Sequence, residues 1–202
     1  NEPLLAALSE FLVKSDFDIK LLVREILNSE TYQRSSRSTA NNREEEHFFS
    51  RYYPRRLQAE VLLDAISQVT GVPSEFTQIG FDGNDFQKTN DYPRGTRAIE
   101  LRDSAIVSDF LDTFGRNDRD ITCECERSNT PSIVQVLHIN NGTTINERLR
   151  ADGNCVERAL SSQLDWYQII RDAFLRTVSR APTETEQRQL IDEIRSTSNA
   201  DP

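Results

Sequence analysis

Acidic and arginine side chains are the residues of this chain whose types and spacing could do chemistry. Glu60 and Asp64 are four residues apart, so on a helix they lie on one face. Two carboxylates in one cleft can serve as acid and base in glycoside hydrolysis. The catalytic candidates are therefore Glu60, Asp64 and Glu126. The arginines that could bind an anionic group beside them are Arg56, Arg116, Arg119 and Arg127.

The same charged residues could instead form a structural network. Among the 24 basic residues only Lys14, Lys20 and Lys88 are lysines, and arginine pairs with a carboxylate through two parallel hydrogen bonds. Such pairs hold helices together, and they perturb pKa values without any catalysis. We favour this structural interpretation, so whether the chain is an enzyme stays open. An open cleft with two carboxylates at the separation found in glycosidases would favour the hypothesis that the chain is an enzyme.

The three cysteines form an odd set, Cys123, Cys125 and Cys155, which allows at most one internal disulfide. A bond between Cys123 and Cys125 would be strained and redox-active. Pairing of either with Cys155 is equally open, and small buried thiols are the structural alternative. Zinc needs four ligands at a standard spacing, which these residues and two distant histidines do not supply. The sequence predicts no metal and, without a C-x-x-C-H motif, no haem in this chain.

Composition limits the classes of partner. The formal net charge is −9 at pH 7, which argues against nucleic acid and anionic membrane surfaces, because both require basic protein surfaces. No run of about 18 apolar residues is present, so no membrane span is predicted. With 202 residues and 36% hydrophobic content, the chain can bury a core of its own.

One helix, predicted over residues 54–71, must position the acidic candidates. It opens with a proline, is closed by a glycine, and carries a broad apolar face. Arg56, Glu60 and Asp64 stack on its other side. Because buried charges need partners, we expect arginines of residues 115–127 to neutralise the two carboxylates and to join both regions into one body.

Helical periodicity and capping residues predict the remaining elements. Asn1, Asp18 and Thr130 are suitable N-caps, and Thr183 with Glu186 forms a capping box. The predicted helices cover residues 4–12, 19–32, 106–114, 131–141, 166–178 and 184–194. The fold class is all-α: one irregular, orthogonal helical domain over residues 1–202 with little or no β structure.

Two connections of this predicted domain are long. The polar stretch 33–47 contains paired serines and asparagines and three consecutive glutamates, and it is predicted to be disordered or open to proteolytic nicking. Residues 72–96 carry several aromatic side chains that need somewhere to pack. We therefore expect an ordered loop there.

Several motifs together resemble one known family, the domain of unknown function at the C-terminal end of planctomycete-type cytochrome c proteins. They follow in the family's order along nearly the whole chain. They are the opening at 1–12, Ile-Leu-x-Ser-x-x-Tyr-x-x-Ser-Ser at 26–36, Arg-Arg-Leu-x-Ala-Glu at 55–60, Tyr-Pro-Arg at 92–94, Phe-Leu-x-x-Phe-Gly-Arg at 110–116, Cys-x-Cys-Glu-Arg at 123–127, Gln-x-Leu-x-x-Asn-Asn-Gly at 135–142 and Arg-Ala-Pro-Thr at 180–183.

The resemblance implies export to the periplasm or cell surface, where a disulfide can form. It implies no established activity. Members usually carry further helical sequence before Asn1, so we expect a truncated or processed piece of a larger protein. Any haem would belong to a linked domain or partner, because this chain contains no cytochrome segment.

The predicted function is an accessory or structural module that binds other domains or chains of the same exported assembly, among them a c-type cytochrome. The alternative is an enzyme domain that acts on polysaccharide or is coupled to haem redox chemistry through the carboxylate and arginine cluster. A third hypothesis is carbohydrate binding without catalysis, through Trp166 or tyrosines exposed on a shallow groove.

Overall fold

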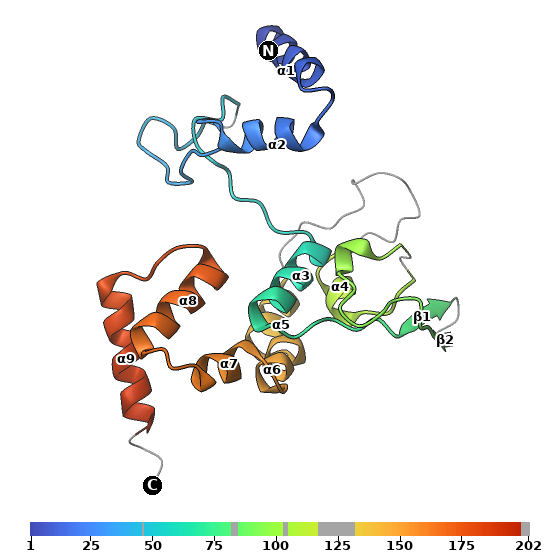
Figure 1. The fold of residues 1–202 in the computed structure, drawn as a ribbon, viewed down its shortest axis with the longest axis vertical. Helices are drawn as coiled ribbons and strands as arrows, with labels where there is room; N and C mark the ends of the chain where they lie inside the picture. Colours follow the sequence, from blue (N-terminus) through green and yellow to red (C-terminus); the bar gives the residue numbers. More distant parts are fainter. Residues whose placement is uncertain (46, 82–84, 103–104, 117–131, 199–202) are drawn as a thin grey trace. The chain divides into compact units, whose positions relative to one another are not determined.

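The computed structural model describes residues 1–45, 47–81, 85–102, 105–116 and 132–198. The chain divides into two compact units, Asn1–Arg56 and Leu57–Pro202 (Figure 1). The described part is mainly helical, with one small two-stranded sheet. This confirms the prediction of a mainly helical protein. That residues 1–202 form one domain stays a prediction.

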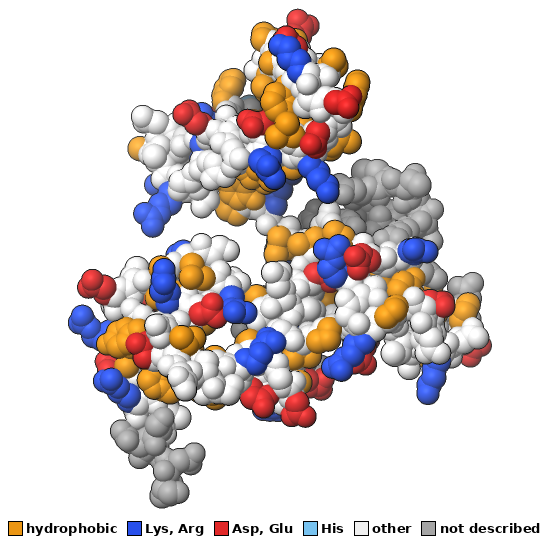
Figure 2. All heavy atoms as spheres, in the orientation of Figure 1, with side chains coloured by type: hydrophobic (Ala, Val, Ile, Leu, Met, Phe, Trp, Pro, Cys, Tyr) orange, Lys and Arg blue, Asp and Glu red, His pale blue; other side chains and the backbone are white. Residues whose placement is uncertain are grey.

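The first unit contains the helices α1 (Glu2–Lys14) and α2 (Ile19–Asn28). Both predicted caps are confirmed, because the Asn1 and Asp18 side chains each accept a backbone N–H three residues on, at 3.3 and 3.0 Å. No described residue of this unit is buried. Leu5, for example, is 67% exposed, and Figure 2 shows apolar side chains on the surface of α1.

The polar stretch of this unit is organised around Glu45. The Phe48 N–H and the Ser50 hydroxyl donate to its carboxylate, and together they hold the pKa of Glu45 at about 2, well below its usual value. Arg34 reaches across the stretch and donates to the carbonyl of Phe49 at 2.7 Å. Proteolytic nicking within residues 33–47 stays a prediction.

The second unit is built around α3 (Ala59–Thr70). This helix begins at Ala59 and not at Pro54 as predicted. Leu57 is 54% exposed, so an earlier start would bury no further apolar side chain to stabilise the added turn. Gly71 ends the helix as predicted, in the left-handed conformation with φ of 72°.

A β-hairpin of strands β1 (Gln78–Phe81) and β2 (Asp85–Lys88) follows. Because of pairing with β1, the next helix is shorter than predicted. The helix predicted over 106–114 is only α4 (Asp109–Thr113). Residues 105–107 pair with β1 instead: Gly80 N donates to Ala105 O at 2.7 Å, and Val107 N donates to Gln78 O at 3.0 Å. Tertiary pairing thus overrides the local helical pattern here.

The hydrophobic core of the second unit lies between α3, α4 and the short 3-10 helix η1 (Ala98–Glu100). Phe110 and Phe114 stack in it with ring centroids 4.3 Å apart. Its buried apolar residues are Ala59, Leu63, Ile66, Phe76, Ala98, Leu101, Ile106, Phe110, Leu111 and Phe114.

Two helices, α5 (Ile133–Asn141) and α6 (Thr143–Arg150), meet at Gly142. The predicted end of the first helix is confirmed. A Cβ at Gly142 would lie 2.2 Å from the carbonyl oxygen of His138. The residue type is therefore fixed by this close approach of the backbone.

The start of α5 differs from the prediction. Ser132 caps it through a reciprocal pair of bonds with Gln135, at 3.3 and 3.2 Å, whereas Thr130 lies outside the described residues. Gln135 is also the buried residue of this helix, 8% exposed, and its amide donates to Thr113 O at 2.9 Å. Polar Gln135 therefore faces inward while several apolar residues of α5 face water.

The chain ends in α7 (Cys155–Ser161), α8 (Trp166–Val178) and α9 (Glu184–Ser198). The predicted capping box is confirmed: Thr183 N donates to Glu186 Oε2 at 2.8 Å, and Glu186 N donates to Thr183 Oγ1 at 3.3 Å. Among the described residues, no helix has the length and apolar character that crossing a membrane requires.

The core assignment can be tested with two isoleucines. Ile106 is fully buried and bridges to Ile79, whereas Ile133 is 76% exposed. We expect Ile106→Ala to lower the free energy of unfolding by about 2–5 kcal/mol, because it leaves a cavity. Ile133→Ala, the matched control, should change it by less than about 0.5 kcal/mol. Urea unfolding followed by circular dichroism measures both, and equal losses would contradict the core.

Acid should weaken the start of α9 in a defined pH range. The Arg180 guanidinium, followed by the Thr183 N–H, lowers the pKa of Glu186 from 4.5 to about 2. A carboxyl with a lowered folded pKa stabilises the fold above its unfolded pKa, and this contribution is lost as the pH falls towards 2. We expect the Tm of Glu186→Gln to lie below that of the wild type from pH 5 to 7 and to match it near pH 2.

The control for this acid effect is Glu193→Gln, an exposed glutamate of the same helix. Its Tm should follow the wild type at every pH. A Glu186→Gln variant that also follows the wild type between pH 5 and 7 would show that the pair with Arg180 contributes nothing to α9.

Candidate functional site

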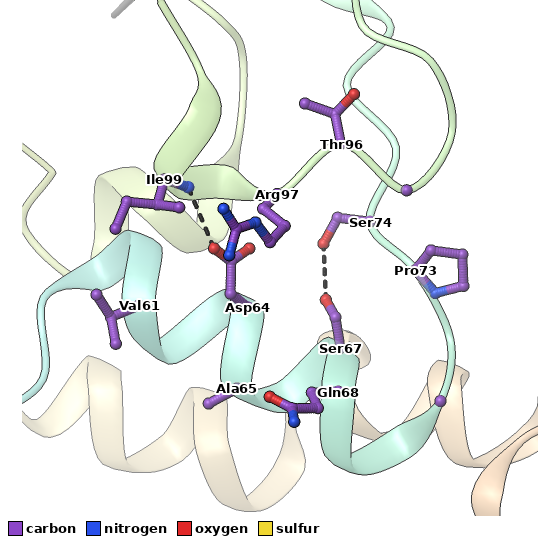
Figure 3. A pocket seen from close by; sticks show the side chains of 12 residues that line it. Val61, Asp64, Ala65, Ser67, Gln68, Pro73, Ser74, Thr96, Arg97 and Ile99 are labelled. Carbon is purple, nitrogen blue, oxygen red and sulfur yellow. Dashed lines mark hydrogen bonds between the residues drawn. The ribbon is translucent and has the colours of Figure 1, made fainter. Parts of the chain in front are cut away.

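A pocket of about 540 Å³ lies against α3 in the second unit (Figure 3). One wall is the outer side of α3, and the opposite wall is the segment that leads into η1. Side chains and backbone from twelve residues form it: Val61, Asp64, Ala65, Ser67, Gln68, Gly71, Pro73, Ser74, Gly95, Thr96, Arg97 and Ile99. Its size is in the usual range of small-molecule pockets, about 300–1,000 Å³.

Asp64 is the charged residue of the α3 wall. Its Oδ1 accepts the Ala98 N–H at 2.6 Å, and its Oδ2 accepts the Ile99 N–H at 3.2 Å. Hydrogen bonds to an ionised acceptor are about twice as strong as neutral ones. These two bonds therefore tie η1 to α3 and hold the carboxylate in place at the edge of the pocket.

Arg148 of α6 fixes the serines at the other end of the pocket. Its Nη1 donates to Ser67 Oγ and its Nη2 to Ser74 Oγ, each at 2.8 Å. Ser67 in turn donates to Leu63 O at 2.9 Å and lies 3.0 Å from Ser74 Oγ. A hydroxyl that accepts from a guanidinium and donates to a carbonyl is a poor nucleophile. The cluster is therefore structural, joining α6 to α3.

Burial affects Arg148 itself. Desolvation lowers the pKa of its guanidinium, and the negative charge of Asp64 acts in the opposite direction. The two residues attract each other at longer range than an ion pair. A guanidinium from α6 thus acts on Asp64, whereas Arg119 and Arg127 lie outside the described residues.

Arg97 stands on the other wall, beside Asp64 in Figure 3. Its Nη2 donates to Glu100 Oε1 at 3.0 Å, and its backbone N–H donates to Glu100 Oε2 at 3.1 Å. The backbone bond, followed by the side-chain bond, lowers the pKa of Glu100. Both side chains are more than half exposed, so Arg97 adds a donor to the pocket without a net charge.

The predicted catalytic carboxylates do not come together in this pocket. Glu60 is only 4% exposed and is buried on α3, whereas Asp64 lies in the pocket wall, and Glu126 lies outside the described residues. Asp64 is the single carboxylate among the described residues that line the pocket. A glycosidase needs two carboxyl groups facing each other across the bound sugar.

The predicted arginines also separate. Arg56 is exposed ahead of α3, and Arg119 and Arg127 lie outside the described residues. Arg116 Nη2 donates to Asp112 Oδ1 at 2.7 Å within the same turn. Its side chain is 8% exposed, and its Nε and Nη1 make no hydrogen bond in the described part of the chain. Arg116 therefore does not contribute to the expected neutralisation of Asp64, which binds backbone amides, and the other arginines of residues 115–127 lie outside the described residues.

Of the cysteines, Cys123 and Cys125 lie outside the described residues. Cys155 is the first residue of α7, half-buried, and its thiol is free. Among the described residues, no group of three or more His, Cys, Asp or Glu side chains gathers in a way that could hold a metal ion.

A second pocket of about 320 Å³ lies beside His138. The ring meets Phe110 and Phe114 edge-on, with centroids 5.5 and 5.8 Å apart, and its Nε2 lies 2.9 Å from Thr144 Oγ1. This bond connects the end of α5 to the start of α6. The ring therefore has a packing role in the described part of the chain.

Sequence reasoning missed most of the residues that shape the first pocket. Gln68 follows Asp64 by one helical turn, so a helical projection could have included it. Arg148 is 81 residues from Ser67, and no local pattern indicates that contact. Arg97 and Glu100 are spaced i, i+3, at which side chains can pair on a helix, so this spacing weakly predicts their ion pair.

The Asp64 contact can be tested by removing its carboxylate. We expect Asp64→Ala to lower the free energy of unfolding by about 2 kcal/mol, because the Ala98 and Ile99 amides lose a charged acceptor. The matched control is Asp172→Ala, which breaks an exposed pair with Arg176 and should cost less than about 0.5 kcal/mol. Denaturant titration gives both values, and equal costs would refute the role of Asp64.

Comparisons with known proteins identify the family of this chain. A family model described as "PSD1: Protein of unknown function (DUF1553)" matches residues 1–194. No curated protein and no solved structure matches the chain. Because the match covers nearly the whole sequence, the chain belongs to this family of unknown function.

Proposed function

We propose that this chain is a non-catalytic, partner-binding module of an exported, cytochrome-associated protein. The observation that carries the proposal is the outward apolar surface of α5. Ile133 is 76% exposed there, and Val134, Val136 and Leu137 are each more than half exposed. The buried position on the same helix is taken by Gln135. A helix that turns apolar residues to water and a polar one inward is typical of a binding surface.

The energetics support burial of this surface in an assembly. Each large aliphatic side chain gains about 1.5–3 kcal/mol when it is moved from water into an apolar contact. The surface named here, Ile133, Val134, Val136 and Leu137 of α5, is a continuous set on one helix. A partner that covers it would therefore gain several kcal/mol before the entropy cost of association.

The pocket beside α3 supports binding over catalysis. It offers one carboxylate, and that carboxylate already accepts two backbone N–H groups. Its two serines are held by Arg148, and no carboxylate or histidine of the described residues bonds to their hydroxyls. The polysaccharide-degrading alternative needs a second facing carboxylate, and the described lining residues offer none.

The cytochrome association and the location in the periplasm or at the cell surface rest on the motif series described above. Net charge adds a physical reason for a redox partner of opposite charge. The chain carries −9 at pH 7, and a basic partner surface would be steered towards it. In this proposal haem belongs to a linked domain or partner, and this chain supplies a docking surface.

Hydrogen exchange on the native protein, isolated from its own cells, tests the proposal. We expect the amides of α5 to exchange at least tenfold more slowly in the native protein than in the separate 202-residue chain, because a partner surface covers them. The same preparation should contain covalently bound haem, measured as its pyridine adduct. Unchanged exchange of α5, or a native preparation without haem, would refute the proposal.

A pair of variants on α5 makes this test specific. Ile133→Ser should restore fast exchange of α5 in the native protein, because it removes the most exposed apolar side chain of the surface. The control is Asn140→Ser, an exposed polar position on the same helix, which should leave the exchange slow. The Tm of the separate chain shows whether either variant perturbs the fold.

A further inference from the structure

The charges around the pocket beside α3 cancel in pairs. The charge of Asp64 is offset by Arg148, which lies behind the serines, and the charge of Arg97 is offset by Glu100. The nearby Arg158 lies against Gly71 but is not one of the lining residues. An anionic ligand would approach Asp64, and a cationic one would approach Arg97. A neutral ligand is repelled by neither of these charges, so we expect the pocket to prefer one.

The pocket still holds unused donors and acceptors. Each oxygen of Asp64 accepts one N–H, which leaves further lone pairs on both. Gln68, one turn along α3, is exposed, and its side chain makes no hydrogen bond in the described part of the chain. It offers both a carbonyl oxygen and an NH2 group. Arg97 keeps free N–H groups after its bond to Glu100.

Acceptors and donors side by side match one chemical group in particular. A hydroxyl donates one hydrogen bond and accepts others, so neighbouring hydroxyls can bind a carboxylate, an amide and a guanidinium together. Between these polar groups the walls are small or apolar: Val61, Ala65, Pro73 and Ile99. Such walls suit the C–H face of a ring, which carries its hydroxyls at the edge.

From this arrangement we propose that the pocket beside α3 binds a neutral, polyhydroxylated molecule of the size of a sugar unit. This is a binding site separate from the α5 surface, and it requires no catalysis. Asp64 and Gln68 bind hydroxyls from the α3 wall, and Arg97 donates from the opposite wall. Only a few hydrogen bonds form in an open pocket, so the Kd is on the order of 1–10 mM.

A nuclear magnetic resonance titration of the full 202-residue chain tests this site. The probes are D-glucose, D-galactose and D-mannose, each added to roughly ten times the Kd expected for weak ligands. We expect at least one of them to shift the Ala98 and Ile99 amide signals and the Gln68 side-chain NH2 signal along one saturation curve. If none of the three shifts these signals, the proposal is wrong.

Charged sugars test the preference for a neutral ligand. D-glucosamine and D-glucuronate place one positive or one negative charge on a similar ring. We expect both to bind at least threefold more weakly than the best neutral hexose. Tighter binding of either charged sugar would overturn the assignment and identify the ligand as a cation or an anion.

Three variants locate the site. Gln68→Ala should weaken hexose binding by at least fivefold, because it removes a donor and an acceptor, and Ala65→Leu should abolish binding by filling the pocket. The matched control is Gln163→Ala, an exposed glutamine outside the pocket, which should bind as the wild type does. Equal binding by the Gln68 and Gln163 variants would overturn the proposal, and an unchanged amide spectrum elsewhere shows that each variant is folded.

Discussion

Two backbone amides that bind one carboxylate hold the larger unit of this protein together. Asp64 projects from the middle of α3, and the Ala98 and Ile99 amides at the start of η1 both donate to it. A short 3-10 helix has few internal hydrogen bonds, so its free N–H groups need such an acceptor. Ala98, one of these donors, is fully buried in the core. The polar contact at the surface and the apolar packing beneath it therefore depend on each other.

A second polar contact also joins a neighbouring element to α3, near the C-terminal end of this helix. Arg148 ties α6 to Ser67 and Ser74, and burial of its guanidinium is made tolerable by these hydroxyls and by the charge of Asp64. The inner surface of this unit is thus partly polar. Part of its apolar surface, on α5, faces outward. This division suits a module whose fold is fixed by its core and these hydrogen bonds, while the exposed apolar side chains of α5 are left for a partner.

Local signals made much of the fold predictable. The caps at Asn1 and Asp18, the stop at Gly71 and the Thr183 capping box all involve residues within one helical turn, and each is confirmed. Residues 106 and 107 were predicted as helix and pair with β1 instead. Their pairing partner, β1, lies 27 residues earlier in the sequence, counted from Ile106 to Ile79, and no local pattern indicates it.

The contacts of the candidate site were even harder to predict from local sequence patterns. Charge spacing singled out Asp64, and the expected partner was an arginine from residues 115–127. Among the described residues, which leave out 117–127, the partners of Asp64 are main-chain amides. Backbone donors carry no sequence signature, because every residue except proline has one. Arg148 reaches α3 from far along the chain, and its sequence neighbours do not distinguish it from the other arginines.

Asp64 also links the stability of the unit to the pocket. The same carboxylate that fixes η1 presents its remaining lone pairs to the pocket, so a ligand would meet a group whose position is already set by the fold. Loss of this carboxylate would therefore disturb both the fold and the site. Gln68 has no comparable structural contact in the described residues. It is the position at which binding in the pocket can be separated from the integrity of the helix that forms its wall.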